Sequence, residues 1–84
     1  MEIVIRPRVQ KYINNSGEKE RLVKHLKKLS EDHYNSRSGV DKKKLKGKKH
    51  VMYRLRVGEH RFEYFVEEEK IWVDEAFKRG RGYR

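Results

Sequence analysis

Two neighbouring segments of the chain alternate strictly between apolar and polar residues. Over residues 51–57 and 61–67, one side of this alternation carries Tyr53, Leu55, Val57, Phe62, Tyr64 and Val66. A period of two residues is typical of β-strands that bury one face. The alternation therefore predicts two strands at about 51–57 and 61–67, joined through the short turn Gly-Glu-His.

A leucine stripe upstream of these strands predicts the main helix. Leu22, Leu26 and Leu29 recur at the three- and four-residue spacing of one helix face, and His33 continues the stripe. This pattern predicts a helix over about residues 18–34. His33 is interpreted as a boundary residue of the apolar stripe rather than as a ligand or an acid–base group.

Shorter patterns complete the order of elements. β-branched residues at the N-terminus predict a first strand, and Pro7 is suited to open a short helix over residues 7–13. The last strand is predicted at about residues 70–78. The expected fold is α+β with the order β-α-α-β-β-β, in which the two N-terminal helices pack on one face of a small, mainly antiparallel sheet. A chain of 84 residues is expected to form a single domain over residues 1–84.

The segment between helices and strands is predicted to be loop. Residues 35–41 are polar, and residues 42–50 contain six lysines. Such a run is either a solvated basic loop or a rim that follows phosphate groups, and the two interpretations are compatible. As a phosphate-binding rim, its nucleic-acid-binding candidates are Lys44, Lys46, Lys48 and Lys49.

The net charge of +10 is unevenly distributed, since residues 42–84 carry 14 basic and 7 acidic side chains. Repulsion on this scale costs folding free energy, and a polyanionic partner removes that cost. The charge therefore favours a nucleic-acid partner. A surface that is basic only for solubility is the alternative.

Other side-chain types limit the chemistry. The chain has no cysteine, which excludes a disulfide framework and a thiolate metal site. Its four histidines lack metal-ligand spacing, so neither a metal nor another cofactor is expected. No apolar run reaches the length of a membrane span, and no signal peptide is apparent after Met1. These features favour a cytoplasmic location.

The polar side of the two alternating strands carries Arg54, Arg56 and Arg61. Clustered guanidinium groups bind phosphate bidentately and stay charged, so this arrangement points to nucleic acid. The alternative is a cross-strand ladder in which the arginines pair with Glu63 and Glu75. An exposed pair of that kind contributes only about 0.2–1 kcal/mol. In either case this face is predicted to be left to solvent.

The C-terminal tail adds more groups of the same kind. Arg79, Arg81 and Arg84 extend the basic surface, and Tyr83 lies among them. A tyrosine beside arginines can stack on a nucleobase, which contributes about 1–3 kcal/mol per base.

Several motifs in this order resemble the RelE/ParE toxin superfamily. The N-terminal IVIRPRVQKYI is similar to the first strand and helix of that family, and KLKG, YRLRVGEHR and KRGRGYR are similar to motifs of its C-terminal half. The last of these is similar to a frequent HRxxxY ending. The resemblance covers nearly all of the chain, apart from about residues 35–41. It implies the same β-α-α-β-β-β fold and a short acidic antitoxin as partner, with which a toxin would form a hetero-oligomer.

Within the superfamily, the resemblance is to the RelE branch. It implies a ribosome-dependent endoribonuclease, a hydrolase that binds RNA, cuts messenger RNA in the decoding site and inhibits translation. The positions that match the catalytic set of that branch are Arg54, Arg56, Arg61, Arg79 and Tyr83. The ParE branch shares the fold but inhibits DNA gyrase, and it generally lacks the full set. A ParE-type inhibitor and an RNA-binding module without catalysis are the alternatives.

The resemblance implies cleavage without a metal, by attack of a 2′-hydroxyl on the adjacent phosphate with loss of a 5′-hydroxyl. Arg61 would hold the phosphate, Arg79 would stabilise charge on the leaving oxygen, and Tyr83 would stack on a base.

The identity of the general base stays open. The family often has lysines where this chain has Arg54 and Arg56, and an arginine side chain keeps its proton up to about pH 12. Either Arg56 only stabilises charge, or the base is Glu63, Glu75 or a group of the ribosome.

Overall fold

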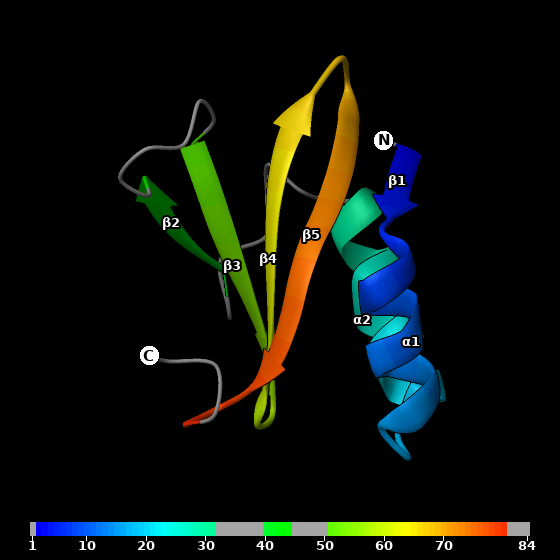
Figure 1. Ribbon diagram of the computed structural model, residues 1–84. Coiled ribbons are helices and arrows are strands. Elements are labelled where there is room, and N and C mark those ends of the chain that lie inside the picture. Colours follow the sequence, from blue (N-terminus) through cyan, green and yellow to red (C-terminus); the bar gives the residue numbers. More distant parts are fainter. Residues whose placement is uncertain (1, 32–39, 45–50, 81–84) are drawn as a thin grey trace.

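The part of the chain that the structure describes has an α+β fold. This computed structural model describes residues 2–31, 40–44 and 51–80, the middle segment as backbone. The elements are β1 (Glu2–Ile5), α1 (Pro7–Asn15), α2 (Lys19–Glu31), β2 (Val40–Lys44), β3 (Val51–Val57), β4 (His60–Glu67) and β5 (Lys70–Lys78). Figure 1 shows both helices together on one side of the sheet, which confirms the predicted arrangement.

The strands form one mixed sheet in the order β1-β5-β4-β3-β2. β1 lies parallel to β5, and the other neighbouring pairs are antiparallel. The mainly antiparallel sheet is therefore confirmed. Its longest pairing joins β4 to β5 and contains an irregularity between Glu63 and Tyr64, where Asp74 of β5 has no partner in the register.

Strand β2 corrects the prediction that residues 35–50 are loop throughout. Val40–Lys44 pairs antiparallel with β3, so that Asp41 lies in register with Arg54 and Lys43 with Met52. Backbone groups along the edge of β3 need partners whatever the side chains of the next segment are. Lysines are common on edge strands, where they discourage pairing with other chains. Because β2 lacks an apolar alternation, its sequence did not indicate a strand.

The helices agree with the predicted segments and differ in their ends. α1 runs on to Asn15 from Pro7, which occupies the first helical turn. α2 ends at Glu31, and residues 32–34, including His33, lie outside the described part. Between the helices, Gly17 has a φ of 77°, a left-handed conformation that favours glycine where the chain reverses. Neither helix has the length and apolarity that crossing a membrane requires.

The core lies between the helices and one face of the sheet. The buried leucines of α2 meet the inward residues of the strands, and α1 adds Val9 and Ile13. The inward set predicted from the alternation is confirmed, with Leu55, Val57, Phe62 and Tyr64 buried and Tyr53 and Val66 partly buried. Burying one such side chain stabilises the fold by about 1.5–3 kcal/mol. Burial also raises the pKa of the Tyr64 phenol, so this group stays neutral.

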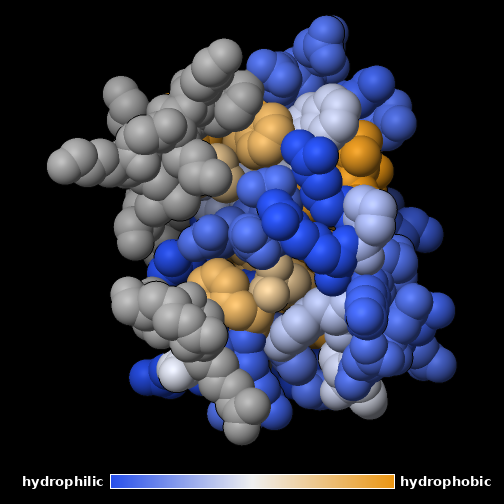
Figure 2. All heavy atoms as spheres, in the orientation of Figure 1, coloured by the Kyte–Doolittle hydropathy of each residue, from blue (hydrophilic) through white to orange (hydrophobic). Residues whose placement is uncertain are grey.

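The opposite face of the sheet is not entirely left to solvent, which corrects the second part of that prediction. Met52 and Phe65 are buried there, outside the core of the helix side. Phe65 stacks on Trp72 with ring centres 6.2 Å apart. These apolar residues fall in the polar phase of the alternation, so the face is apolar at one end and charged near the turn between β3 and β4. In Figure 2, apolar patches lie between hydrophilic residues on the side of the molecule that faces the viewer.

Candidate nucleic-acid interface

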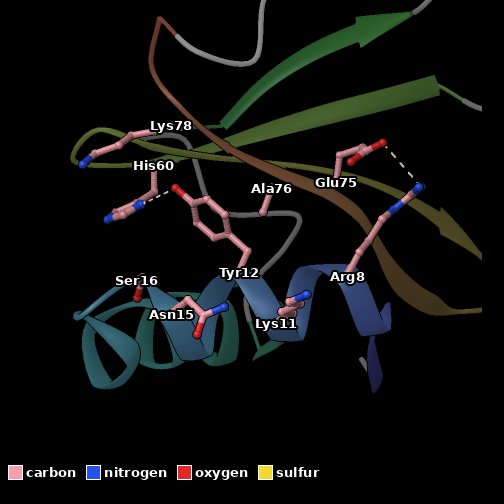
Figure 3. Close-up of a pocket in the computed structure, with 9 residues that line it drawn as sticks. All are labelled: Arg8, Lys11, Tyr12, Asn15, Ser16, His60, Glu75, Ala76 and Lys78. Carbon is pink, nitrogen blue, oxygen red and sulfur yellow. Dashed lines mark hydrogen bonds and ion pairs between the residues drawn. The ribbon is translucent and has the colours of Figure 1, made fainter.

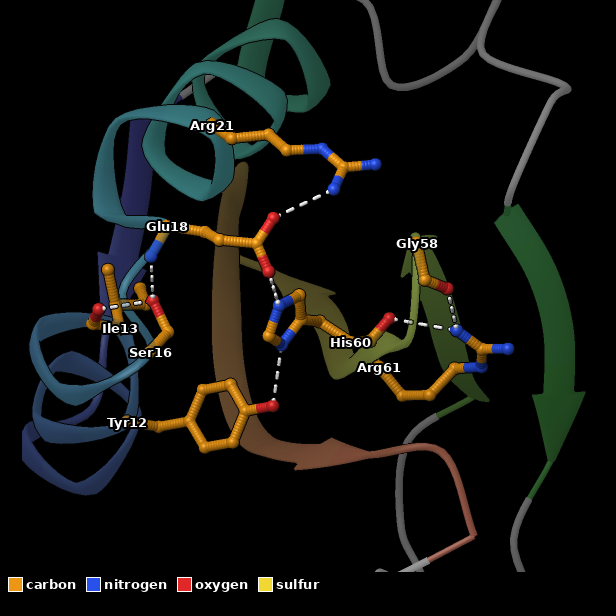
Figure 4. Close-up of polar contacts among 8 residues, drawn as sticks. All are labelled: Tyr12, Ile13, Ser16, Glu18, Arg21, Gly58, His60 and Arg61. Atoms are coloured by element: carbon orange, nitrogen blue, oxygen red, sulfur yellow. Dashed lines mark hydrogen bonds and ion pairs between the residues drawn. The ribbon is translucent and has the colours of Figure 1, made fainter.

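Arg56 and Arg61 lie directly opposite each other on β3 and β4, beside the turn that joins these strands. The Nη1 atom of Arg61 donates hydrogen bonds to the carbonyl oxygens of Gly58, at 2.8 Å, and His60, at 3.0 Å (Figure 4). Among the described residues, Nε and Nη2 of Arg61 make no further hydrogen bond. These two atoms are the pair that binds a phosphate side-on, so the orientation of Arg61 suits an anion.

Arg54 has a different environment. Its Nη2 atom lies 2.7 Å from Oε2 of Glu63, and both side chains are 15% exposed. The guanidinium carbon also lies 5.6 Å from the centre of the Phe77 ring. The cross-strand pairing that was the alternative to phosphate binding is thus present for Arg54. Glu75, by contrast, forms an ion pair with Arg8 of α1 at 3.4 Å.

Arg79 reaches the same turn from the end of β5. Its backbone N–H donates to the carbonyl oxygen of Glu59 at 2.6 Å. Arg79 is exposed, as is Arg56. The structure therefore brings Arg56 of β3, Arg61 of β4 and Arg79, which follows β5, together around the turn of residues 58–60.

The remaining predicted site residues lie beyond what the structure describes. Lys44 is described as backbone only, at the end of β2. The other candidates fall in residues 45–50 and 81–84, and they are Lys46, Lys48, Lys49, Arg81, Tyr83 and Arg84.

A pocket of about 480 Å³ lies on the helix side, between α1 and the end of the sheet. Figure 3 shows Tyr12 standing in the middle of this pocket, with Lys78 and His60 on one side and the Arg8–Glu75 pair on the other. None of the predicted site arginines lines it. The pocket and the arginine cluster are therefore separate features.

A buried histidine connects this pocket to the turn. His60 is only 3% exposed. Its Nδ1 lies 2.7 Å from the Tyr12 hydroxyl, and its Nε2 lies 2.8 Å from Oε2 of Glu18. Oε1 of Glu18 in turn accepts a hydrogen bond of 2.8 Å from Arg21. Figure 4 shows this chain of contacts running from α1 through β4 to α2.

The charges of this network are set by its contacts. The hydrogen bonds from His60 and then Arg21 lower the pKa of the Glu18 carboxyl, so Glu18 is an acceptor and the His60 Nε2 carries a proton. A histidine ring that donates through Nε2 can accept at Nδ1, so the Tyr12 hydroxyl is placed to donate there. Burial and the nearby charge of Glu18 raise the pKa of Tyr12, which keeps this donor protonated.

The spacing of the histidines along the sequence does not indicate this network. The sequence does indicate that His60 points inward, since it lies two and four positions before the inward residues Phe62 and Tyr64. Its partners Tyr12 and Glu18 are 48 and 42 residues away, and no local pattern joins them. Within residues 2–31 and 51–80, no group of three or more histidine, aspartate or glutamate side chains is placed to hold a metal ion.

Comparison with known proteins gives a likeness in structure only. No family model matches this chain, and no curated protein matches it. The crystal structure of the archaeal RelE–RelB complex from Pyrococcus horikoshii OT3 contains a chain that superposes with a TM-score of 0.74 and is 23% identical. The match covers 96% of this chain and 97% of that one. The resemblance to RelE is thereby confirmed for the fold, and this chain has a RelE-like fold over nearly its whole length.

Proposed function

We propose that this protein is the toxin of a toxin–antitoxin pair and a metal-independent endoribonuclease that cuts messenger RNA on the ribosome. The observation that carries the proposal is the placement of Arg61 beside Arg56 and Arg79 at one turn of a RelE-like fold. Arg61 is held by two carbonyl oxygens of that turn, with Nε and Nη2 in place for a phosphate. Preorganised donors of this kind stabilise charge as it develops in a transition state.

The proposed reaction is an attack by a 2′-hydroxyl on the adjacent phosphorus, which breaks the bond to the 5′-oxygen. Arg61 binds the phosphate oxygens and stabilises the phosphorane. Arg79 stabilises the negative charge on the leaving oxygen, and Tyr83 stacks on a displaced base. The lysines of residues 42–50 and Arg81 and Arg84 attract the RNA backbone.

The ion pair of Arg54 with Glu63 bears on the general base. Arg54 is bound to the Glu63 carboxylate within the sheet, so we assign it the support of the site and not a direct contact with the phosphate. Arg56 stabilises charge, because a guanidinium group does not serve as a base. The base is then Glu63, Glu75 or a group of the ribosome, and Glu63 would have to act while it accepts the hydrogen bond of Arg54.

The partner follows from the same comparison. The matched solved structure is a RelE–RelB complex, and RelE is there bound to RelB. For this chain we propose a short acidic antitoxin in the cytoplasm, in a hetero-oligomer that covers the basic face. Its acidic side chains would remove the repulsion within a chain of net charge +10.

Primer extension on programmed, translating ribosomes tests the proposal. The purified protein should cut messenger in the decoding site. Arg61→Ala should lower the single-turnover rate by about 10²–10³-fold, the loss seen when one preorganised donor is removed.

Lys24→Ala is the matched control, because it removes one positive charge from an exposed position of α2, outside the cluster. Equal cleavage by Arg61→Ala and the wild-type protein would reject the role of Arg61. Absence of cleavage together with inhibition of gyrase would favour the ParE-type alternative.

A further inference from the structure

The turn of residues 58–60 is the common support of Arg61 and Arg79. Arg61 binds it through a side-chain Nη1 atom that bridges the carbonyl oxygens of Gly58 and His60. Arg79 binds it through its backbone N–H and the carbonyl oxygen of Glu59. All three carbonyl groups of the turn thus hold one of these two arginines, so any displacement of the turn moves both.

The turn between β3 and β4 is connected to the helices through a buried side chain. Here the fixed point is His60, whose buried ring is bonded on both nitrogen atoms. Tyr12 holds it from α1, and Glu18 holds it from the start of α2. The Tyr12 ring also meets His60 edge-on at 83°, which restricts rotation of the imidazole.

Arg21 closes the network on the other side of the turn. It bonds to Glu18 at 2.8 Å, and its guanidinium atoms lie 3.1–3.2 Å from the position that a Cβ on Gly58 would take. Gly58 has a φ of 59°, so both the backbone conformation and the contact with Arg21 favour glycine there. Figure 4 shows the Glu18 carboxylate bonded to both Arg21 and the His60 ring, so the residue beside Gly58 and the ring of His60 share one partner.

We propose that His60 is a positioning residue: its contacts with Tyr12 and Glu18 fix the turn of residues 58–60 on the helices and thereby set the positions of both Arg61 and Arg79. The role in cleavage rests on the proposed function, whereas the control of the turn does not. His60 points toward the helices and the arginines lie around the turn, so His60 acts through the backbone and does not touch the RNA. Displacement of a catalytic group by about 1 Å can lower a rate about 10²-fold, so the network matters for activity as well as for stability.

The test compares His60→Leu with Leu29→Ala, a core variant in α2 far along the chain from the turn. Leu29 is 3% exposed, so its truncation destabilises the fold. It lies near the C-terminal end of α2, about three helical turns from Glu18, which contacts His60. The temperature is set for each variant to the same interval below its own midpoint of unfolding. His60→Gln is the conservative variant, since an amide can donate to Glu18 and accept from Tyr12.

Two quantities are measured on each protein. The first is hydrogen exchange of the Arg79 amide, which is bonded to Glu59. The second is single-turnover cleavage on programmed ribosomes, as a maximal rate and a half-saturating ribosome concentration. In His60→Leu, we expect the Arg79 amide to exchange at least about tenfold faster than in Leu29→Ala. The maximal cleavage rate of His60→Leu should be about 10–100-fold below that of the wild-type protein, and its half-saturating ribosome concentration should stay within about threefold of the wild-type value. His60→Gln should recover a large part of both.

The two readings separate the failures. If the wild-type protein cuts no messenger, the proposed function fails, while the exchange of Arg79 still tests the positioning role. If Arg79 exchanges alike in His60→Leu and Leu29→Ala, the positioning role is wrong, whatever the cleavage rates. If the Arg79 amide exchanges faster in His60→Leu but this variant cuts at the wild-type rate, His60 does fix the turn. The proposed effect of the turn on cleavage is then wrong.

Discussion

Arg54 and Glu63 form an ion pair of 2.7 Å across β3 and β4. Two positions closer to the turn, Arg56 lies opposite Arg61. The arginine cluster is therefore divided. At Arg54 the charge is balanced by a carboxylate within the sheet. At Arg56 and Arg61 two positive residues face each other beside the turn, and a bound anion would relieve the repulsion between them.

The first prediction concerns Glu63. Glu63→Ala should lower the free energy of unfolding by about 2–4 kcal/mol, because it leaves the Arg54 guanidinium largely buried without its carboxylate. Urea unfolding measures this. Glu75→Ala is the control, since the Glu75 side chain is 46% exposed and should cost less than about 1 kcal/mol. Similar losses in the two variants would contradict the division of the cluster.

The second prediction concerns the fold of Arg61→Ala. Its free energy of unfolding should lie within about 0.5 kcal/mol of the wild-type value or above it, because repulsion with Arg56 is relieved. Thermal unfolding in low and moderate salt measures this, and any gain should shrink as salt screens the charges. A large loss of stability would mean that the side-chain contacts of Arg61 with the turn matter more for folding than for an anion.

The third prediction assigns the role of Tyr83. If the ring only stacks on a base, Tyr83→Phe should cut messenger within about threefold of the wild-type rate, whereas Tyr83→Ala loses the stacking free energy of about 1–3 kcal/mol. If the hydroxyl moves a proton, both variants should be slow. Single-turnover cleavage on ribosomes distinguishes the two outcomes.

The fourth prediction concerns the turn between β4 and β5. Glu68 and Glu69 have φ values of 54° and 58°, a conformation that costs a residue other than glycine about 1 kcal/mol. The double variant Glu68→Asn, Glu69→Gly should therefore raise the free energy of unfolding by about 1 kcal/mol. Glu68→Gln with Glu69→Gln removes the same charges and should lack this gain. Equal stability of the two double variants would show that charge, not backbone conformation, dominates there.

The fifth prediction is the pH dependence of the His60 network. Because its contacts lower the pKa of Glu18 below the ordinary 4.5, the stabilisation from Glu18 is complete above about pH 4.5 and is lost as the pH falls through the lowered value. The difference in unfolding free energy between wild-type protein and Glu18→Gln should therefore shrink between about pH 5 and pH 3. Urea unfolding across this range measures it, and a constant difference would contradict the assigned contacts.

The local spacing of residues determined which faces pack against the helices. The leucine stripe of α2 and the alternation over residues 51–67 depend only on neighbours within a few positions, so the sequence alone predicted the helix, the hairpin and the shared face of Arg54, Arg56 and Arg61. Where the spacing carried no apolar signal, as in Val40–Lys44, the strand was missed, because an edge strand forms through its backbone.

Tertiary structure decided how these parts meet. The pairing of Arg54 with Glu63 depends on the register of β3 against β4, and the approach of Arg79 to Glu59 depends on where β5 ends beside β4. The contacts of His60 with Tyr12 and Glu18 join residues more than 40 positions apart. Hydrogen bonds and ion pairs act over about 3 Å, so they are fixed only when packing of the helices on the sheet has brought their partners to that distance.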